Sequence, residues 1–178
     1  MKKILLISAS PRRGGNSDIL CDEFARGARE AGHMPEKIFL RDRKVGFCTG
    51  CNACQTAGLC ARKDDAAEIL EKMVSADALV FASPVYFYAM DAQLKALIDR
   101  SVARFREMTQ KDVYIIVSAA MSEQDSVMRA VDSIRGFTQF GLPDAREKGV
   151  LAAMDVWSAG DVREKPEMLA AYRMGFHA

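Results

Sequence analysis

The sequence predicts an α/β protein in which helices cover both faces of one parallel sheet. Short, continuous apolar runs recur along the chain, and the clearest are residues 4–7, 78–82 and 113–117. Runs of this kind, without polar alternation, are typical of strands buried on both faces. Segments with apolar residues at helical spacing separate them. Strands that alternate with helices in this way favour a parallel sheet.

The first half of the chain gives two strands and two helices. A helix is expected after the first strand, capped by Asn16 or Ser17 and ended by Gly32. A second strand is expected at residues 37–40. Residues 41–62 have no regular periodicity, and residues 64–75 return to helical spacing.

The second half repeats the alternation. The third strand, residues 78–82, is expected to stop pairing at Pro84, because proline cannot donate to a strand ladder. Helices are expected at residues 92–106 and 126–140, on either side of the fourth strand. A fifth strand is expected at residues 150–154, and a last helix from Pro166 to Gly175.

Five such strands with right-handed crossovers leave few arrangements. We expect the flavodoxin-like order 2-1-3-4-5, a five-stranded parallel sheet with helices on both faces. The 178 residues are expected to form a single domain, with a cysteine-rich loop at about residues 45–62.

Charge and hydropathy exclude several classes of partner. The chain has 25 basic and 24 acidic residues without a basic block, so neither nucleic acid nor an anionic membrane is an expected partner. The lack of an acidic excess favours an enzyme over a small electron shuttle. The apolar run at residues 4–7 is too short for a signal peptide, and no stretch is long enough to span a bilayer. A cytoplasmic protein is therefore expected.

Residues 8–17, Ser-Ala-Ser-Pro-Arg-Arg-Gly-Gly-Asn-Ser, follow the first strand and have the composition of a phosphate-binding loop. Ligands of such sheets bind at the carboxyl ends of the strands. Gly14 and Gly15 permit close backbone approach, and the next helix points its N-terminus at the same place. Neither a Walker A loop nor a G-x-G-x-x-G fingerprint is present, which favours a mononucleotide. An ordinary strand–helix connection remains the alternative.

Residues 83–88, Ser-Pro-Val-Tyr-Phe-Tyr, follow the third strand at the same edge of the sheet. Their three aromatic side chains would suit the flat, largely apolar slot that a flavin ring needs. The alternative is that these aromatic residues make core or dimer contacts.

The cysteines Cys48, Cys51, Cys54 and Cys60 have the spacing C-x2-C-x2-C-x5-C. Four closely spaced thiolates are a usual ligand set for a [4Fe–4S] cluster. Free thiols and a zinc site remain open as alternatives. Cys21 lies on the expected first helix and is interpreted as a small core residue.

Residues 8–17 and 83–88, together with Gln93-Leu94-Lys95 and Ile98-Asp99-Arg100, resemble the NAD(P)H-dependent FMN reductases and iron–sulfur flavoproteins. A fainter likeness extends to Gly160-Asp161-Val162. The resemblance implies that FMN is bound by residues of three loops, namely Ser8, Ser10, Pro11, Arg12, Gly15, Asn16, Ser17, Ser83, Pro84, Val85, Tyr86, Phe87, Tyr88, Ser118 and Ala119. The third loop departs from the family pattern, because Ala119-Ala120-Met121 replaces its glycines.

The resemblance also implies the function. We expect an FMN-dependent oxidoreductase that passes electrons from NAD(P)H or a reduced carrier to a quinone, a flavin or another acceptor, with or without a [4Fe–4S] cluster. A homodimer or homotetramer is expected. The alternative is a non-enzymatic electron-transfer or redox-sensing flavoprotein. No catalytic side chain is predicted, since His33 and His177 lie at the ends of expected helices.

Overall fold

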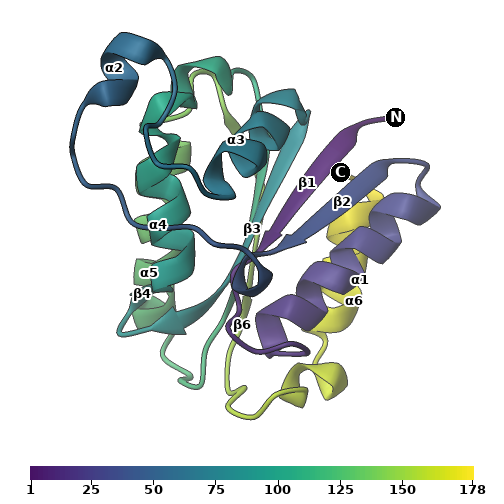
Figure 1. Cartoon of the computed structure of the whole chain (residues 1–178). Helices are drawn as coiled ribbons and strands as arrows, with labels where there is room; N and C mark the ends of the chain where they lie inside the picture. The colour runs from purple at the N-terminus through teal and green to yellow at the C-terminus, as the bar shows by residue number, and fades with distance from the viewer.

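Five parallel strands form the centre of the molecule, in a computed structural model that describes residues 1–178. The strands run in the order β2-β1-β3-β5-β6, which confirms the flavodoxin-like order expected from the sequence. A sixth strand, β4, pairs antiparallel with the end of β3 (Figure 1). The bounds are β1 Lys3–Ser8, β2 Met34–Phe39, β3 Ala78–Tyr86, β4 Ala89–Met90, β5 Asp112–Ser118 and β6 Arg146–Ala153.

Helices cover both faces of this sheet (Figure 1). Their bounds are α1 Asn16–Glu30, α2 Ala53–Ala57, α3 Ala66–Ser75, α4 Ala92–Arg100, α5 Gln124–Thr138 and α6 Glu167–Phe176. Short 3-10 turns lie at Leu40–Asp42, Ser101–Ala103, Phe105–Glu107 and Asp161–Glu164.

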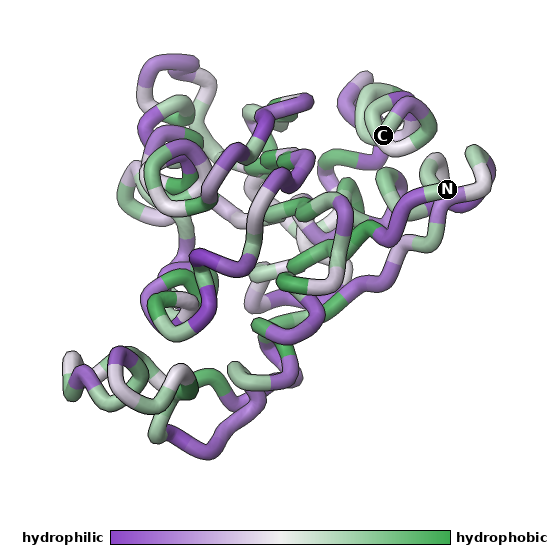
Figure 2. The backbone as a smooth tube through the Cα atoms, turned by 90° about the horizontal axis from the view of Figure 1, so that it is seen from above, coloured by the Kyte–Doolittle hydropathy of each residue, from purple (hydrophilic) through white to green (hydrophobic).

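The alternation of side chains along each strand divides the interior into two cores. In β1, Leu5 and Ile7 face the core under α3, α4 and α5, whereas Ile4 and Leu6 face the core under α1 and α6. The middle residues of the central strands are accordingly apolar, and Figure 2 shows hydrophobic segments near the centre of the molecule. Cys21 is fully buried in the second core, as expected from the sequence.

Several expected boundaries are wrong: β6, expected from residue 150, begins at Arg146, and three others have a clear physical reason. Pro84 does not stop strand pairing: it is the last residue paired with β5, opposite Ser118, and β3 continues to Tyr86 by pairing with β4. A proline at the final position of the ladder removes little of it. The helix expected to reach residue 106 ends at Arg100, where the Ser101 hydroxyl donates to the Ile98 carbonyl oxygen.

The third error concerns Gly175, which lies inside α6 instead of ending it. A Cβ atom there would come within 2.0 Å of the Phe24 carbonyl oxygen, so this glycine permits α6 to approach α1 closely. The two helices pack side by side over one face of the sheet (Figure 1).

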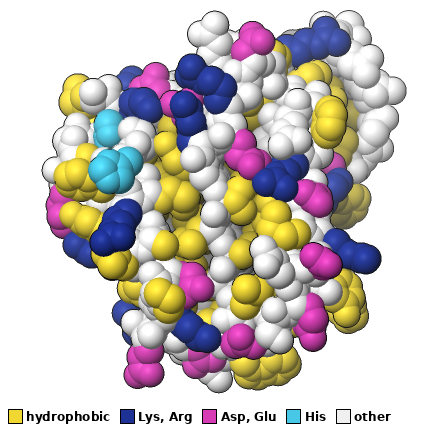
Figure 3. Space-filling view, turned by 180° about the vertical axis from the view of Figure 1, so that it is seen from behind, with side chains coloured by type: hydrophobic (Ala, Val, Ile, Leu, Met, Phe, Trp, Pro, Cys, Tyr) yellow, Lys and Arg dark blue, Asp and Glu magenta, His cyan; other side chains and the backbone are white.

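The cysteine-bearing segment stands apart from the sheet. Its short helix α2 lies at the edge of the molecule, beyond α3 and α4 (Figure 1). On the face shown in Figure 3, basic and acidic side chains are interspersed among apolar ones, in keeping with the net charge of +1. None of the helices is both long and apolar enough to cross a membrane.

Candidate flavin site and cysteine cavity

A cavity of about 230 Å³ opens at the carboxyl ends of β1, β3 and β5. Three predicted segments meet there, together with a fourth that was not predicted. The lining residues are Ser10, Arg12, Gly15, Asn16, Ser17, Pro84, Val85, Tyr86, Ser118, Ala120, Val156, Trp157 and Ala159. We call this the flavin cavity, after the ligand expected from the sequence.

Six predicted site residues lie behind the lining of the flavin cavity or away from it. Ser8 is buried, and its hydroxyl donates to Asp18. The Ser83 hydroxyl donates to the Pro84 carbonyl oxygen and accepts from a backbone N–H of α4's capping residue. Pro11 and Ala119 are also absent from the lining; Ala119 is buried and hydrogen-bonded through its backbone to residues after β6.

The other two, Phe87 and Tyr88, form the tip of the β3–β4 hairpin. Both have positive φ angles, 46° and 64°, a conformation that is costly for bulky side chains. Phe87 is 98% exposed, so it points to solvent and does not line the flavin cavity. Only Tyr86 of the three aromatic residues lines the cavity.

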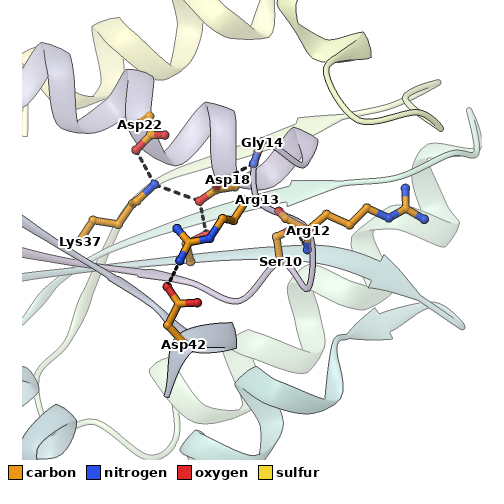
Figure 4. Close-up of polar contacts among 9 residues, drawn as sticks. Ser10, Arg12, Arg13, Gly14, Asp18, Asp22, Lys37 and Asp42 are labelled. Carbon is orange, nitrogen blue, oxygen red and sulfur yellow. Dashed lines mark hydrogen bonds and ion pairs between the residues drawn. The ribbon is translucent and has the colours of Figure 1, made fainter. Parts of the chain in front are cut away.

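Asp18 projects from α1 and fixes the shape of the phosphate loop, residues 8–17 (Figure 4). Its carboxylate accepts from the Ser8 hydroxyl at 2.7 Å, from the Gly14 backbone N–H at 3.0 Å and from the Lys37 ammonium at 3.0 Å. Lys37 also pairs with Asp22 at 2.5 Å. The positive charge of Lys37 thereby offsets the negative charge of Asp18 next to the loop, so that Asp18 opposes a bound anion less.

The two arginines of the loop point in opposite directions (Figure 4). Arg13 turns away from the cavity, pairs with Asp42 and stacks over the Phe39 ring. Arg12 lines the cavity and makes no ion pair; its Nη1 lies 3.5 Å from the Trp157 carbonyl oxygen. Arg12 is therefore the loop's free cation at the cavity.

Gly15 and Ser17 complete the cradle. A Cβ atom at Gly15 would come within 2.5 Å of the Ser10 hydroxyl, so the loop can close this tightly only around glycine. Gly15 also caps α1 by its position, in place of the expected Asn16 or Ser17. The Ser17 hydroxyl is buried without a hydrogen-bond partner and belongs to a residue that lines the cavity.

Asn16 has a role that sequence reasoning missed. Its side-chain N–H groups donate to the carbonyl oxygens of Val156 and Ser158, at 3.2 and 2.9 Å. Its side-chain oxygen accepts from the backbone N–H groups of Gly160 and Val162, at 3.0 and 3.2 Å. The amide is fully used in holding residues 156–162, so it is not a free phosphate donor.

Residues 156–162, the Trp157 loop, form the unpredicted wall of the flavin cavity. Asp161 also fixes this loop by accepting from the backbone N–H groups of Trp157 and Ser158, at 2.9 and 2.6 Å. Trp157 itself is 78% exposed at the rim. The faint likeness at Gly160-Asp161-Val162 was the only sequence signal for this wall.

The four predicted cysteines line one second cavity, the cysteine cavity, with Arg62 and Arg100 among its other residues. All four are free of disulfides. As placed, no three His, Cys, Asp or Glu side chains lie close enough to hold a single metal ion. The Ala53 backbone N–H and the Thr49 hydroxyl hold the pKa of the Cys51 thiol below its usual range.

A buried ion pair anchors both ends of the cysteine segment to α4. Arg100 bonds both carboxylate oxygens of Asp64, at 2.7 and 3.0 Å. Asp64 in turn accepts from the Gly46 backbone N–H at 3.0 Å. Asp64, and to a lesser extent Cys60, raises the pKa of Arg100, so this guanidinium is a permanent cation beside the cysteines.

A phosphate-type loop and an adjoining cavity at the carboxyl edge of a 2-1-3-4-5 sheet define a flavodoxin-like, mononucleotide-binding class of protein. The chain belongs to the NADPH-dependent FMN reductase family, whose family model matches residues 2–154. This confirms the family indicated by the sequence motifs.

Individual relatives agree with this family. The chain is 46% identical over 99 residues to the iron-sulfur flavoprotein MJ1083 of Methanocaldococcus jannaschii, covering 56% of this chain and 51% of the relative. It is 33% identical over 128 residues to an iron-sulfur flavoprotein of Archaeoglobus fulgidus, covering 70% of this chain and 58% of that relative. The aligned part thus amounts to little more than half of these relatives' length.

Solved structures share the fold. The NAD(P)H:quinone oxidoreductase from Methanothermobacter marburgensis superposes with a TM-score of 0.74, over 99% of this chain and 95% of that one, at 21% identity. At that identity the likeness is evidence of the fold alone.

Proposed function

We propose that this chain is an FMN-dependent oxidoreductase and that the flavin cavity holds FMN, with its phosphate on the loop of residues 8–17. The observation that carries this proposal is the free cation of Arg12 beside the N-terminus of α1. Membership of the NADPH-dependent FMN reductase family supports the same ligand. We also propose that residues 1–178 act as one flavin-binding domain.

The residues present fit a phosphate group. The N-terminus of α1 has free backbone N–H groups and a partial positive charge, which together favour an anion. Arg12 supplies a charge-assisted donor. The buried Ser17 hydroxyl has no partner within the protein, and a phosphate oxygen would satisfy it. Lys37 keeps the Asp18 carboxylate from opposing this anion.

The neighbouring wall fits a flavin ring in part. Pro84, Val85 and Tyr86 are the last residues of β3 and line the cavity with mostly apolar side chains and backbone polar groups. Ser118, which pairs with Pro84 between β3 and β5, and Ala120 also line the cavity. The Trp157 loop adds an aromatic rim. These residues bind and orient the ring, while bound FMN supplies the redox chemistry.

NAD(P)H or a reduced electron carrier is proposed as donor, and a quinone, a flavin or another acceptor as acceptor. A curated relative from Bacillus subtilis is named as a putative NAD(P)H-dependent FMN-containing oxidoreductase, which favours an enzyme. The test is steady-state oxidation of NADH and NADPH by FMN-loaded protein, with and without a quinone. Retained FMN without turnover for either nucleotide would favour the electron-transfer alternative, and failure to retain FMN would overturn both.

We further propose that the cysteine cavity holds a [4Fe–4S] cluster. Each thiolate ligates a different iron of such a cluster, so four cysteines around one cavity fit it better than they fit a single ion. The buried cation of Arg100 suits an anionic group, and two relatives are named iron-sulfur flavoproteins. Free thiols remain the competing state.

Anaerobic purification with iron and sulfide analysis separates these states. We expect about four irons and four sulfides per chain, since one thiolate binds each iron. A control variant, Cys21→Ala, removes the cysteine outside the cavity without placing a polar group in the core, and is expected to keep the iron. About one metal ion per chain, or none, would contradict the cluster.

Finally, we propose that copies of the chain assemble as homodimers or homotetramers through the β3–β4 hairpin. Its tip exposes an aromatic ring on a costly backbone conformation beside the flavin cavity, which is a feature expected of a contact surface. Sedimentation of the wild type and of Phe87→Asn, which tolerates the positive φ, tests this. A monomeric wild type, or an unchanged oligomer in the variant, would contradict it.

A further inference from the structure

Arg100 is the largest fully buried side chain of the molecule, with 1% of its surface exposed, and it lines the cysteine cavity. Four of its five N–H groups have partners. Nη1 donates to the Gly46 carbonyl oxygen at 2.9 Å and to Asp64 at 2.7 Å. Nη2 donates to Asp64 at 3.0 Å and to the Arg62 carbonyl oxygen at 3.4 Å.

The fifth donor, Nε–H, is buried and has no partner. Buried donors are nearly always satisfied, so this exception calls for a partner in the loaded site. The Asp64 pair fixes the guanidinium through Nη1 and Nη2 and leaves Nε without a partner. The unpaired Nε–H thus belongs to a guanidinium that four hydrogen bonds hold in place at the wall of the cysteine cavity.

Cys60 lines the same cavity as Arg100 and lies two residues before Arg62, whose carbonyl oxygen accepts a hydrogen bond from Arg100. The segment between Gly46 and Asp64 is tied to Arg100 at both ends. Arg100 thus has two properties of an outer partner of a ligand set: it holds the ligand-bearing loop, and it keeps one donor free while it lines the cavity.

We propose that Arg100 is a positioning residue for the cysteine cavity, and that its Nε–H donates to the sulfur of Cys60 when the four thiolates hold a cluster. This inference rests on the cluster proposed above. Its cation also offsets the negative charge that four thiolates bring together. Since reduction adds an electron and hence negative charge, a buried cation nearby favours the reduced state.

Three variants test this. Arg100→Gln removes the charge, and Arg100→Lys keeps it but loses the planar donor. Arg135→Gln is the control, because Arg135 likewise pairs with two carboxylates, Asp132 and Glu147, and lines neither the cysteine cavity nor the flavin cavity. FMN uptake at the separate flavin cavity reports whether each variant is folded.

Each protein is reconstituted anaerobically with iron and sulfide. The rate of iron loss to a chelator and the midpoint potential under dithionite titration are then measured. Loss of an outer partner typically weakens a metal site about 10- to 100-fold. We expect Arg100→Gln to lose iron at least about tenfold faster and to have a more negative midpoint potential. Arg100→Lys should keep the potential closer to wild type but still lose iron faster, and Arg135→Gln should match wild type in both.

The outcomes separate the two proposals. A folded wild type that takes up no cluster overturns the cluster, and the role of Arg100 with it. A wild type that holds the cluster beside an Arg100→Gln variant with unchanged potential and iron loss overturns the role of Arg100 alone. If Arg100→Gln fails to bind FMN, the Arg100→Lys variant decides: iron loss equal to wild type contradicts the inference.

Discussion

The side-chain amide of Asn16 donates to the carbonyl oxygen of Ser158 at 2.9 Å, joining the start of α1 to a loop 142 residues further along the chain. The same amide makes three more hydrogen bonds to that loop. The phosphate loop and the Trp157 loop are therefore parts of one structure, and the shape of the flavin cavity depends on both.

Replacing Asn16 by Ala should destabilise the protein by roughly 2–3 kcal/mol, because buried backbone groups lose their partners. Chemical unfolding at neutral pH measures this. Because a whole wall loosens, FMN and riboflavin should both bind more weakly, by similar factors. Asn16→Asp keeps an oxygen acceptor for the Gly160 and Val162 backbone N–H groups. It should therefore disturb residues 160–162 less than Asn16→Ala does. A stability of Asn16→Ala within about 0.5 kcal/mol of wild type, the size of an ordinary surface change, would contradict this role.

Trp157 is the single tryptophan of the chain and lines the flavin cavity. Its fluorescence should be strongly quenched as FMN binds, because the indole would lie beside the bound flavin. The quenching should saturate at one FMN per chain and vanish in Trp157→Phe. Full indole emission from a protein saturated with FMN would show that the flavin lies elsewhere.

Asp91 gives the stability a pH dependence. Burial raises the pKa of this carboxyl to about 7, against smaller opposing effects of the Leu94 backbone N–H and Ser83. The folded state therefore holds the proton more tightly than the unfolded state, and stability falls as pH rises toward 7. The loss between pH 5 and pH 7 should be roughly 2 kcal/mol.

Asp91→Asn tests this dependence. Asparagine keeps an acceptor for the Leu94 backbone N–H, which caps α4, but cannot ionise. The variant should lose most of the decline in unfolding free energy between pH 5 and pH 7. An equally steep decline in the variant would assign the pH dependence to other groups.

Much of the fold could be predicted because buried parallel strands appear as short apolar runs, as at residues 4–7 and 113–117. The hairpin of β3 and β4 could not, because Phe87 and Tyr88 occupy turn positions that sequence rules reserve for glycine or asparagine. The prediction for Pro84 is wrong because this proline lies at the last paired position of β3 with β5, where a missing N–H costs the ladder little.

The site was predictable where it is local in sequence. Residues of the loop after β1 and of the end of β3 do line one cavity. The role of Asn16 depends on contacts with residues more than 140 positions away. Its sequence neighbours instead predict a helix cap, a position that Gly15 occupies. For the same reason the Trp157 loop was not expected to be a wall of the cavity.

The most direct test of the central claim is an equilibrium titration of FMN and riboflavin with wild type, Arg12→Ala and Arg13→Ala. Arg13 is the matched control, because it lies in the same loop but pairs with Asp42 outside the cavity. The wild type should bind FMN more tightly than riboflavin, which lacks the phosphate. Arg12→Ala should weaken FMN binding about 10- to 100-fold, the equivalent of one charge-assisted hydrogen bond, and should leave riboflavin binding near wild type. Arg13→Ala should bind both ligands with affinities near wild type. Equal losses for FMN and riboflavin in Arg12→Ala, or a wild type that binds neither, would contradict an FMN phosphate site on this loop.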